Sequence, residues 1–408
     1  MNHHASGNGD RHDSLAKKIT EHGIEVIIIA SSFMHSEHRY LYDDVYYVQE
    51  LDKLKYIWLH TKPPYKGNDI NRLLNMISYM RLIKKYANNW WEEFGKPDVV
   101  IGSSVHPFAW EAAYWISKKV GADFYAEVRD LWPLSLIEVQ QLNPNHPLVQ
   151  FFGILEKRAY RRAKKIITTM PYAYIYISET LGFPRDKVVW IPNGIDTERV
   201  DNVLKDSDIK LPDELNLYLE SNWCAVYAGS LVKSECVDYI LEVAEQLQKK
   251  GNNKIKFAIV GNGHQKKDLM KIAKEKKLNN VRFFNRVSKE QTSIVVSKAK
   301  VCLGAVRNLP IYKYGLSMNK LNDYLYSGNP TIFVCDVENV VRLSGGGISI
   351  PYGNIELFVD AIERIYSMNE SERKLMAKRG RETIKEQYDT KKLANELLSI
   401  LNGPNKTE

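Results

Sequence analysis

The sequence predicts an α/β protein built from two Rossmann-like, doubly wound domains. From Ile24 onward, short β-branched runs alternate with amphipathic helical stretches, which is typical of βαβ units and a mainly parallel sheet. A chain of 408 residues is too long for one ordinary hydrophobic core. Hydrophobic and charged residues make up 44% and 26% of the chain, as in soluble globular proteins.

The strands and helices follow in order along the chain. Strands are predicted in the first half at residues 25–30, 98–102, 122–127, 165–169 and 188–191, and in the second half at 224–228, 256–260, 281–284, 301–305, 331–334 and 348–350. Pro192-Asn193-Gly194 and the polar segment 201–221 lack strong periodicity and form the predicted hinge. We therefore place the N-terminal domain at 1–192 and the C-terminal domain at 193–387. The closing helix, about 388–402, is expected to pack back on the first domain.

One expected element of the N-terminal domain is missing. A doubly wound half begins with a strand that becomes central in its sheet, but the first periodic segment here, residues 12–22, is already helical. Residues 1–5 are at most the tail of such a strand. Either the native start lies upstream of Met1, or the sheet lacks its middle strand and keeps two unpaired edges.

Composition excludes several classes of site. The four cysteines all lie in the second half without CxxC spacing, which argues against a zinc site and a disulfide framework. Asp206-Ser207-Asp208 lies in the polar linker and is interpreted as solvated acids, so neither a metal nor a cofactor is expected. No apolar run is long enough to span a bilayer and no signal peptide is recognised, so we expect a cytoplasmic protein.

Two predicted helices are basic and amphipathic. In one, the apolar residues 148–155 precede a basic end at residues 157–165, and the other runs from Arg72 to Trp91. Such helices suit an anionic membrane surface, although a solvated face on a core-packed helix is the commoner interpretation of either alone. The net charge of +8 is modest for this length, and no nucleic-acid partner is expected.

Loops at the carboxyl edge of the second predicted sheet combine features that bind anions. Gly229 permits close backbone approach after the strand 224–228, and Lys233 adds a point charge. A short helix opens at about Asn319, so its free N–H groups face an anion together with Lys320. Asp323, on the same helix face as Lys320, suits a pair of neighbouring hydroxyls such as those of ribose. The alternative interpretation is an ordinary exposed i,i+3 ion pair.

A second glycine loop, Gly261-Asn262-Gly263, is a weaker signal. The dinucleotide fingerprint fails because Lys266 stands where its third glycine would be, and no GxxxxGK[ST] loop is present. Nucleotide binding, if it occurs, therefore uses neither common motif.

Polar residues also follow two strands of the first predicted sheet. In loops 102–108 and 127–133, His106 suits a sugar hydroxyl and Arg129 suits an anionic group, although a lone histidine is commonly structural. No Ser/His/Asp order, nucleophile elbow or paired cysteine nucleophile emerges. The remaining chemistry is group transfer from a phosphate-activated donor, in which cations and a helix N-terminus stabilise the leaving diphosphate.

Taken together and in this order, five segments of the chain resemble the retaining family-4 glycosyltransferases of the GT-B fold. They are residues 103–108, 127–133, 191–196, 229–233 and 319–330, of which Arg129 to Pro133 and Ile191 to Asp196 are the most specific. Within the family, the chain most resembles the fucosamine-transferase-like group, which builds bacterial O-antigen and capsule.

This resemblance implies roles for two sets of residues. The donor-binding set is Gly229, Ser230, Lys233, Gly261, Asn262, Ser317, Met318, Asn319, Lys320 and Asp323, in which Asp323 takes the ribose hydroxyls and the others surround the diphosphate. The acceptor-side set is Ser104, His106, Glu127, Arg129 and Asp130. The predicted catalytic residues are His106, Lys233 and Lys320.

Three positions depart from the family pattern. Gly315 stands where many members have the first of two glutamates eight positions apart. Ser230 replaces a common arginine, and Cys236 replaces a glycine. These departures leave the identity of the donor sugar open.

The resemblance implies a retaining transferase that moves a sugar from a nucleotide diphosphate donor, a UDP-sugar, to a polyprenyl-linked saccharide. We expect it on the inner face of the plasma membrane as a peripheral enzyme of O-antigen, capsule or exopolysaccharide synthesis. One alternative is a UDP-sugar epimerase of the same shape. Another is a catalytically silent subunit of a polysaccharide assembly complex, which the missing strand and Gly315 favour.

Overall fold

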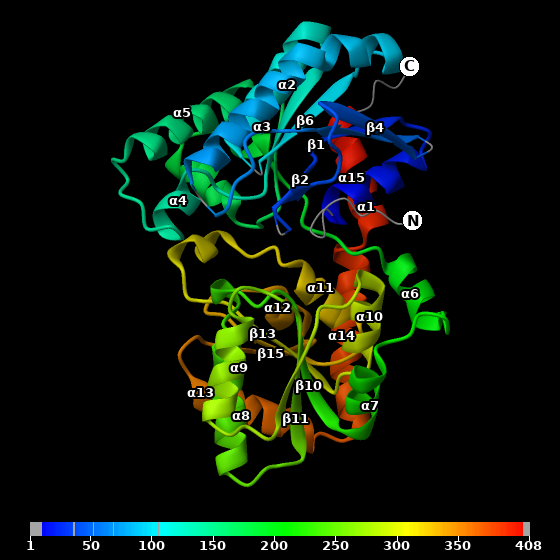
Figure 1. Ribbon diagram of the computed structural model, residues 1–408, viewed down its shortest axis with the longest axis vertical. Coiled ribbons are helices and arrows are strands. Elements are labelled where there is room, and N and C mark those ends of the chain that lie inside the picture. Colours follow the sequence, from blue (N-terminus) through cyan, green and yellow to red (C-terminus); the bar gives the residue numbers. More distant parts are fainter. Residues whose placement is uncertain (1–9, 36, 52, 68, 105, 403–408) are drawn as a thin grey trace. The chain divides into compact units, whose positions relative to one another are not determined.

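The computed structural model describes residues 10–35, 37–51, 53–67, 69–104 and 106–402 (Figure 1). The chain divides into two compact units. Unit 1 comprises the chain up to Asn193, the segment Lys313–Ser317 and the chain from Leu393 onward, and unit 2 comprises Gly194–Tyr312 and Met318–Lys392. Both units are Rossmann-like α/β structures, which confirms the predicted fold class.

The described residues of unit 1 form nine strands and most of the longer helices. The strands are β1 (Val26–Ser31), β2 (Phe33–Met34), β3 (Arg39–Tyr40), β4 (Tyr46–Leu51), β5 (Leu54–Leu59), β6 (Val99–Ser103), β7 (Asp123–Val128), β8 (Ile166–Thr168) and β9 (Val188–Trp190). The helices are α1 (Asp10–Thr20), α2 (Ile70–Phe94), α3 (Pro107–Val120), α4 (Leu134–Glu138), α5 (Pro147–Arg162), a π-helix (Ile175–Thr180), a 3-10 helix (Arg185–Lys187) and most of α15 (Thr390–Asn402).

The main strands of unit 1 form two sheets. One has the order β1-β5-β4, with β1 parallel and β4 antiparallel to β5, and the other is the parallel sheet β6-β7-β8-β9. Strands β2 and β3 form a separate antiparallel pair. The sequence pattern did not predict β4 and β5, because their antiparallel pairing breaks the βαβ alternation on which the prediction depended.

The two sheets share a hydrophobic core on each face. Val26 of β1 and Val99 of β6 both pack on a cluster built from α1, α15 and the β7 to β9 strands. On the other face, Ile29 of β1 and Val100 of β6 pack on a cluster built from β5, α2 and α3. The C-terminal helix contributes Leu393 and Leu397 to the first cluster.

Unit 2, all of whose residues are described, contains one parallel sheet. Its strands are β10 (Trp223–Ala228), β11 (Ile255–Val260), β12 (Val281–Phe284), β13 (Val301–Ala305), β14 (Thr331–Val334) and β15 (Gly347–Ile350), in the order β12-β11-β10-β13-β14-β15. The helices are α6 (Thr197–Lys205), α7 (Asp213–Ser221), α8 (Val237–Lys249), α9 (Lys266–Glu275), α10 (Lys289–Ser297), α11 (Asn319–Tyr326), α12 (Val340–Ser344), α13 (Ile355–Ser367) and α14 (Glu370–Gln387). Short 3-10 helices occupy Lys233–Glu235 and Pro310–Tyr314.

The polar segment 201–221, part of the predicted hinge, is largely helical and lies within unit 2. Asp196 caps α6 by accepting a hydrogen bond from the Arg199 amide at 2.9 Å. Each of α6 and α7 is nine residues long and buries only two or three side chains, among them Val203 and Leu215. Helices this short show little periodicity, which explains the missed assignment.

A buried carboxyl group lies between α5 and the π-helix of unit 1. Glu156 is fully buried and accepts hydrogen bonds from the hydroxyls of Tyr160 and Tyr176, each at 3.0 Å. Burial raises the pKa of Glu156 to about 8, against the smaller opposite effect of these two hydrogen bonds. The carboxyl group is therefore protonated at neutral pH.

Replacing Glu156 with glutamine is expected to flatten the dependence of stability on pH. The raised pKa in the folded state means that the contribution of Glu156 is full below its ordinary pKa and is lost as pH rises toward about 8. The slope is at most about 1.4 kcal/mol per pH unit. Urea unfolding at pH 5, 6.5 and 8 measures it, with Glu179→Gln, an exposed residue, as the control. Identical pH slopes in wild type and Glu156→Gln would contradict the expectation.

Candidate functional site

The loops after β10 and β11 lie in backbone contact at the carboxyl edge of the unit 2 sheet. Ala228 and Val260, the last residues of the two strands, are paired. A Cβ atom on Gly261 would lie 1.9 Å from the carbonyl oxygen of Gly229, and one on Gly263 would lie 2.2 Å from that of Leu231. Both positions therefore require glycine, and the close approach leaves the Gly229 backbone at the edge of the sheet.

Lys266 holds these loops together. Its ammonium donates to the carbonyl oxygens of Gly261 and Phe284 and to the side-chain oxygens of Asn262 and Asn285, at 2.9–3.0 Å. Partial burial lowers the pKa of Lys266. This structural role explains why a lysine stands where the dinucleotide fingerprint has glycine. The Lys266 ammonium also engages the side-chain oxygen of Asn262, a predicted donor-binding residue.

Helix α11 begins at Asn319, as predicted, and faces the end of β10. No side chain caps its N-terminus among the described residues. The hydroxyl of Tyr324 anchors the helix, because it donates to the carbonyl oxygen of Ala228 at 2.8 Å and accepts from the Ala228 amide at 2.9 Å. Free amides and the positive end of the helix dipole are thus placed beside Gly229.

Lys320 lies at the centre of this region. Its ammonium forms an ion pair with Glu235, donates to the hydroxyl of Tyr227 at 3.2 Å and lies 4.9 Å from the centre of that ring. A Cβ atom on Gly229 would lie 3.2 Å from the Lys320 nitrogen. Burial lowers the pKa of Lys320, while the charge of Glu235 raises it. Two predicted donor-binding residues, Gly229 and Lys320, are therefore neighbours, and sequence reasoning missed their partner Glu235.

The other predicted donor loop residues are more exposed. Lys233 and Ser230 are exposed, and the Ser230 carbonyl oxygen accepts from the hydroxyl of Tyr227 at 2.7 Å. Cys236, which follows the 3-10 turn, has φ +45° and ψ 44°. This left-handed conformation favours glycine, which explains why the resembled family has glycine there.

Asp323 and Lys320 do not form the ion pair that local spacing allowed. Both carboxylate oxygens of Asp323 accept from Lys289 of α10, at 2.7 and 3.0 Å. Asp323 therefore lies on α11 where predicted, but a lysine from another helix fixes its orientation.

The segment before α11 has its own partners. Ser317, in unit 1, accepts from the Asn193 amide through its hydroxyl at 3.2 Å and from the Asn193 side chain through its carbonyl oxygen at 2.8 Å. Met318 is half-buried. The side-chain oxygen of Asn319 is buried and accepts no hydrogen bond from any described residue.

Gly315, where the family pattern has a glutamate, cannot hold a larger residue without strain. Its φ is +96°, and a Cβ atom would lie 2.5 Å from two ring carbons of Pro171 in the same unit. The backbone around residue 315 therefore accommodates glycine and not the glutamate of the family pattern.

Gly315→Glu is expected to destabilise the protein by roughly 2–4 kcal/mol, because it combines backbone strain with overlap on Pro171. Gly328→Glu is the matched control: Gly328 also has a positive φ, +85°, but a Cβ atom there would meet no described atom within 4 Å. It should cost only about 1–2 kcal/mol. Thermal unfolding measures the stability of both variants. Equal losses of stability would show that overlap with Pro171 does not contribute to the effect of Gly315→Glu.

In unit 1, the loops after β6 and β7 are adjacent. Ser103 and Glu127 are paired across the two strands. The Ser104 amide donates to the Glu127 carbonyl oxygen at 3.0 Å, and the Ser104 hydroxyl accepts from the Arg129 amide at 3.0 Å. Ser104 is fully buried, so it joins the two loops from within.

Glu127, predicted on the acceptor side, has its carboxylate engaged by three side chains of unit 1. Its buried carboxylate accepts from Arg11 at 2.9 Å, His12 at 2.6 Å and Ser103 at 2.6 Å. Burial acts to raise the pKa of Glu127, but the charges of Arg11 and His12 and the hydrogen bonds hold it well below its ordinary value. Both carboxylate oxygens are thus engaged within the protein.

His106 directly precedes α3 as its N-cap residue, and its ring packs edge-on against Tyr79 with centroids 5.4 Å apart. Burial, followed by the charge of Arg72, lowers the pKa of His106 to about 3, so the imidazole is neutral. Its Nδ1 is buried and has no partner among the described residues. A neutral imidazole either donates to or accepts from a hydroxyl. In the neighbouring loop Arg129 is half-buried and Asp130 is exposed.

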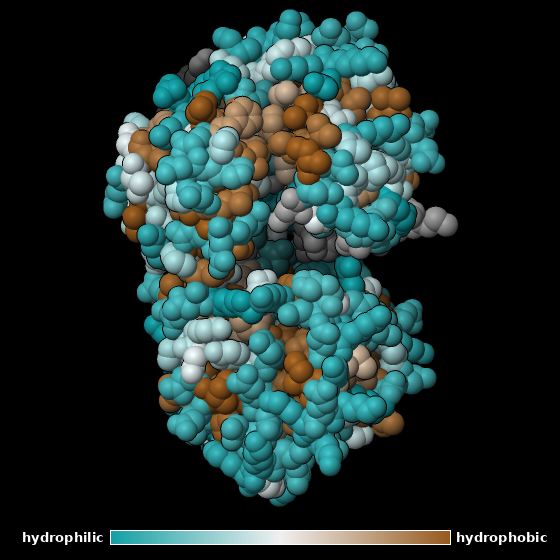
Figure 2. Space-filling view, turned by 60° about the vertical axis from the view of Figure 1, so that its left-hand side comes forward, coloured by the Kyte–Doolittle hydropathy of each residue, from teal (hydrophilic) through white to brown (hydrophobic). Residues whose placement is uncertain are grey.

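The surface of unit 1 carries exposed apolar side chains. Figure 2 shows brown, hydrophobic patches among hydrophilic residues in the upper part of the view. Phe151 and Ile154 of α5 are 43% and 57% exposed, and Ile70 of α2 is 65% exposed. Within the described residues, no helix has the length and apolar character needed to cross a membrane.

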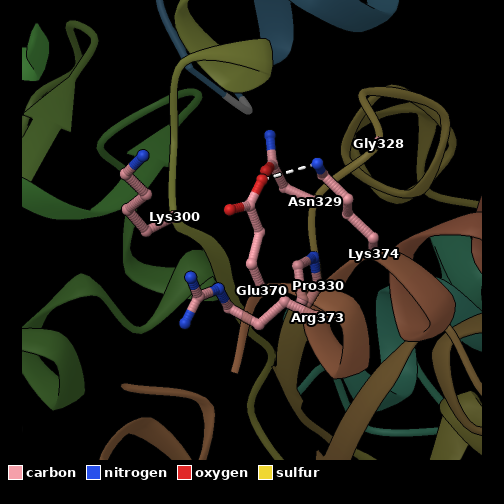
Figure 3. A pocket seen from close by; sticks show the side chains of 7 residues that line it. All are labelled: Lys300, Gly328, Asn329, Pro330, Glu370, Arg373 and Lys374. Carbon is pink, nitrogen blue, oxygen red and sulfur yellow. Dashed lines mark ion pairs between the residues drawn. The ribbon is translucent and has the colours of Figure 1, made fainter. Parts of the chain in front are cut away.

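A cavity of about 300 Å³ lies at the opposite edge of the unit 2 sheet from Gly229 (Figure 3). It is lined by Lys300, Gly328, Asn329, Pro330, Glu370, Arg373 and Lys374. Lys374 pairs with Glu370 at 2.5 Å. Because Lys300 and Pro330 precede β13 and β14, this cavity is separate from the predicted donor residues. The described part of the chain contains no cluster of three side chains suited to a metal ion.

Two family models cover most of the sequence. Residues 13–199 match the model of Glycosyltransferase Family 4, and residues 214–383 match that of Glycosyl transferases group 1. No curated protein matches the chain.

Several solved structures share the fold at low identity. Sucrose-phosphate synthase from Thermosynechococcus elongatus is 13% identical with a TM-score of 0.70, and the match covers 95% of this chain and 90% of that one. WaaG, a glycosyltransferase involved in lipopolysaccharide biosynthesis, is 14% identical with a TM-score of 0.65, covering 97% and 95%. Anabaena HepE in complex with UDP is 12% identical with a TM-score of 0.61, covering 86% of each chain.

Proposed function

The chain is a GT-B glycosyltransferase whose halves match the family-4 and group-1 models, and from this we propose that it moves a sugar from a UDP-sugar to a lipid-linked saccharide with retention. The observation that carries the donor assignment is the meeting of Gly229, the Lys320 ammonium and the uncapped α11 N-terminus. Together they offer positive charge and free amides to a diphosphate. HepE, which was solved with UDP, supports the choice of nucleotide.

In the proposed reaction, the acceptor hydroxyl oxygen bonds to the anomeric carbon of the sugar as the bond from that carbon to the diphosphate breaks. The departing diphosphate oxygen takes the electron pair, and the hydroxyl proton passes to the diphosphate. Lys320 and the α11 amides stabilise the negative charge that develops there. Neither a protein nucleophile nor a metal is assigned a step.

The remaining predicted residues take supporting roles. Asp323, oriented by Lys289, keeps lone pairs that suit the two ribose hydroxyls. Lys233 extends from the loop after β10 as a mobile charge for the diphosphate. In unit 1, the neutral His106 suits a sugar hydroxyl, and the loop with Arg129 and Asp130 shapes the acceptor side.

Product analysis tests this function. The protein is incubated with a panel of UDP-sugars and a polyprenyl-diphosphate-linked saccharide, and NMR determines the anomeric configuration of the product. Transfer with retention is expected. An inverted product, or an epimerised sugar that is still attached to UDP, would overturn the proposal, and the second result would favour an epimerase. Absence of nucleotide-sugar binding in a cooperatively melting protein would favour a silent subunit.

We further propose that α5 and α2 bring unit 1 to an anionic membrane in surface polysaccharide synthesis. Exposed Phe151 and Ile154 lie on α5, which ends in Arg161 and Arg162. Apolar side chains beside basic ones favour the surface of an anionic bilayer. The protein should sediment with vesicles that contain phosphatidylglycerol but not with neutral ones. Joint replacement of Phe151 and Ile154 by serine should reduce sedimentation with the anionic vesicles. Leu217→Ser, at a 66% exposed position of unit 2, should leave that sedimentation unchanged. Equal sedimentation with both vesicle types would refute the location.

A further inference from the structure

We propose that Arg307 is a further donor-binding residue, whose guanidinium holds the diphosphate of the nucleotide sugar beside Gly229. This role rests on the proposed function and adds a residue to the same site. Arg307 follows β13, which ends at Ala305. Strand β13 pairs in parallel with β10, with Cys302 opposite Val226. The loops after both strands therefore leave the carboxyl edge of the sheet, where open α/β sheets bind ligands.

The guanidinium of Arg307 lies beside the turn that leads from β10 into α8. Burial and the charge of Asp238 raise the pKa of the buried Cys236 thiol to about 11, whereas the charge of Arg307 and its hydrogen bond to the thiol act in the opposite direction. Cys236 directly follows Glu235, which pairs with Lys320 of α11. Arg307 and Lys320 thus reach the same turn from two different elements.

No carboxylate among the described residues forms an ion pair with Arg307. Arg307 is half-buried, and its Nε is buried without a hydrogen-bond partner among the same residues. A guanidinium stays charged in proteins, and a desolvated charge is costly unless an anion pairs with it. Its Nε and the neighbouring Nη form an edge with two parallel donors, which matches two phosphate oxygens. The chemistry of Arg307 therefore calls for an anionic ligand.

The charges around the loop after β10 favour a diphosphate. Three basic side chains, Lys233, Lys320 and Arg307, lie in or beside this loop. Glu235 pairs with Lys320 and neutralises it. Asp238, in the first turn of α8, is exposed, so water weakens the effect of its charge. Lys233 and Arg307 thus leave two positive charges for a dianionic diphosphate.

A guanidinium at this position contributes to binding and not to proton transfer. Because it keeps its charge, Arg307 stabilises the diphosphate both in the bound donor and after the bond to the sugar has broken. Its loss should weaken every ligand that carries a diphosphate. Contacts with the base and with the ribose hydroxyls, which suit Asp323, should remain. The effect of Arg307 is therefore expected to follow the phosphates of the ligand and not the nucleoside.

Titration calorimetry with UDP and with inorganic pyrophosphate tests this role. Arg307→Gln is expected to weaken the binding of both by between about tenfold and a hundredfold, because each ligand loses a charge-assisted, bidentate contact. Arg307→Lys, which keeps the charge but not the planar fork, should weaken binding by about three- to tenfold. Saturation-transfer NMR should show an unchanged affinity for uridine, which carries no phosphate. Arg364→Gln, which removes an exposed arginine from the last turn of α13, is the matched control and should change none of these affinities.

Unchanged affinity for UDP and pyrophosphate in Arg307→Gln would overturn the inference. So would an equal loss in Arg364→Gln, because a general loss of positive charge would then explain the effect. An equal loss of uridine affinity would also overturn it, since the site as a whole would then be disturbed. If Arg307→Gln melts below the assay temperature, Arg307→Lys decides, and an unchanged affinity for both phosphate ligands would overturn the inference. A wild-type protein that binds pyrophosphate through Arg307 but does not bind UDP would support the inference and refute the proposed donor.

Discussion

Lys320→Met is expected to weaken UDP binding by between about tenfold and a hundredfold. The ammonium lies beside the Gly229 backbone and the free amides of α11, and a charge-assisted hydrogen bond to a phosphate contributes about 1.5–3 kcal/mol. Calorimetry measures the affinity for UDP. Lys267→Met, which removes an exposed lysine of α9, should leave it unchanged.

Glu235→Gln is expected to act in the opposite direction and to strengthen UDP binding. In the unliganded protein the carboxylate holds Lys320 in an ion pair in which both side chains are largely buried, and the diphosphate must take over that charge. The amide of glutamine removes both the competition and the repulsion between two anions.

The double variant separates a binding role from a folding role. Lys320→Met alone leaves Glu235 without its partner, which destabilises the loop, whereas Lys320→Met with Glu235→Gln removes both charges. If the double variant binds UDP as tightly as Glu235→Gln alone does, Lys320 has no part in binding. In the Lys320→Met background, Glu235→Gln should strengthen UDP binding less than it does in wild type, because only the repulsion between the two anions is left to remove.

Glu127→Ala is expected to cost roughly 3–5 kcal/mol of folding stability. The substitution leaves the buried guanidinium of Arg11 without its carboxylate, and removing one member of a buried ion pair carries a penalty of this size. Asp123→Ala is the matched control on the same strand, because Asp123 pairs with Lys164 at the exposed end of β7. Its loss should stay below about 1 kcal/mol.

Urea unfolding measures both variants, and a pH series adds a second readout. Because the pKa of Glu127 is held well below its ordinary value, its contribution is present above that value and is lost as pH falls through the lower pKa of the folded state. The folding stability of Glu127→Ala should therefore fall less steeply than that of wild type as the pH is lowered. If Glu127→Ala and Asp123→Ala lose similar amounts of folding stability, the buried ion pair of Glu127 with Arg11 does not contribute more than an exposed one.

Local pattern was sufficient for much of the fold. The alternation of β-branched runs with helical stretches predicts the parallel strands, because side-chain periodicity of 2 or 3.6 is a property of neighbouring residues. The helix that opens at Asn319 was predicted for the same reason. The antiparallel β4 and β5 were missed because their pairing breaks that alternation.

The sequence by itself determined the two α/β units, the placement of Gly229 and His106 after strands, and that of Lys320 in the first turn of a helix, because these positions follow from local periodicity. Only the tertiary structure decided which charges meet. Glu235 pairs with Lys320, Lys289 with Asp323, and Arg11 with Glu127 across 116 positions of the chain. Such pairs join loops and helices that no spacing rule connects. Their partners are selected by packing and by the requirement that buried charges be neutralised.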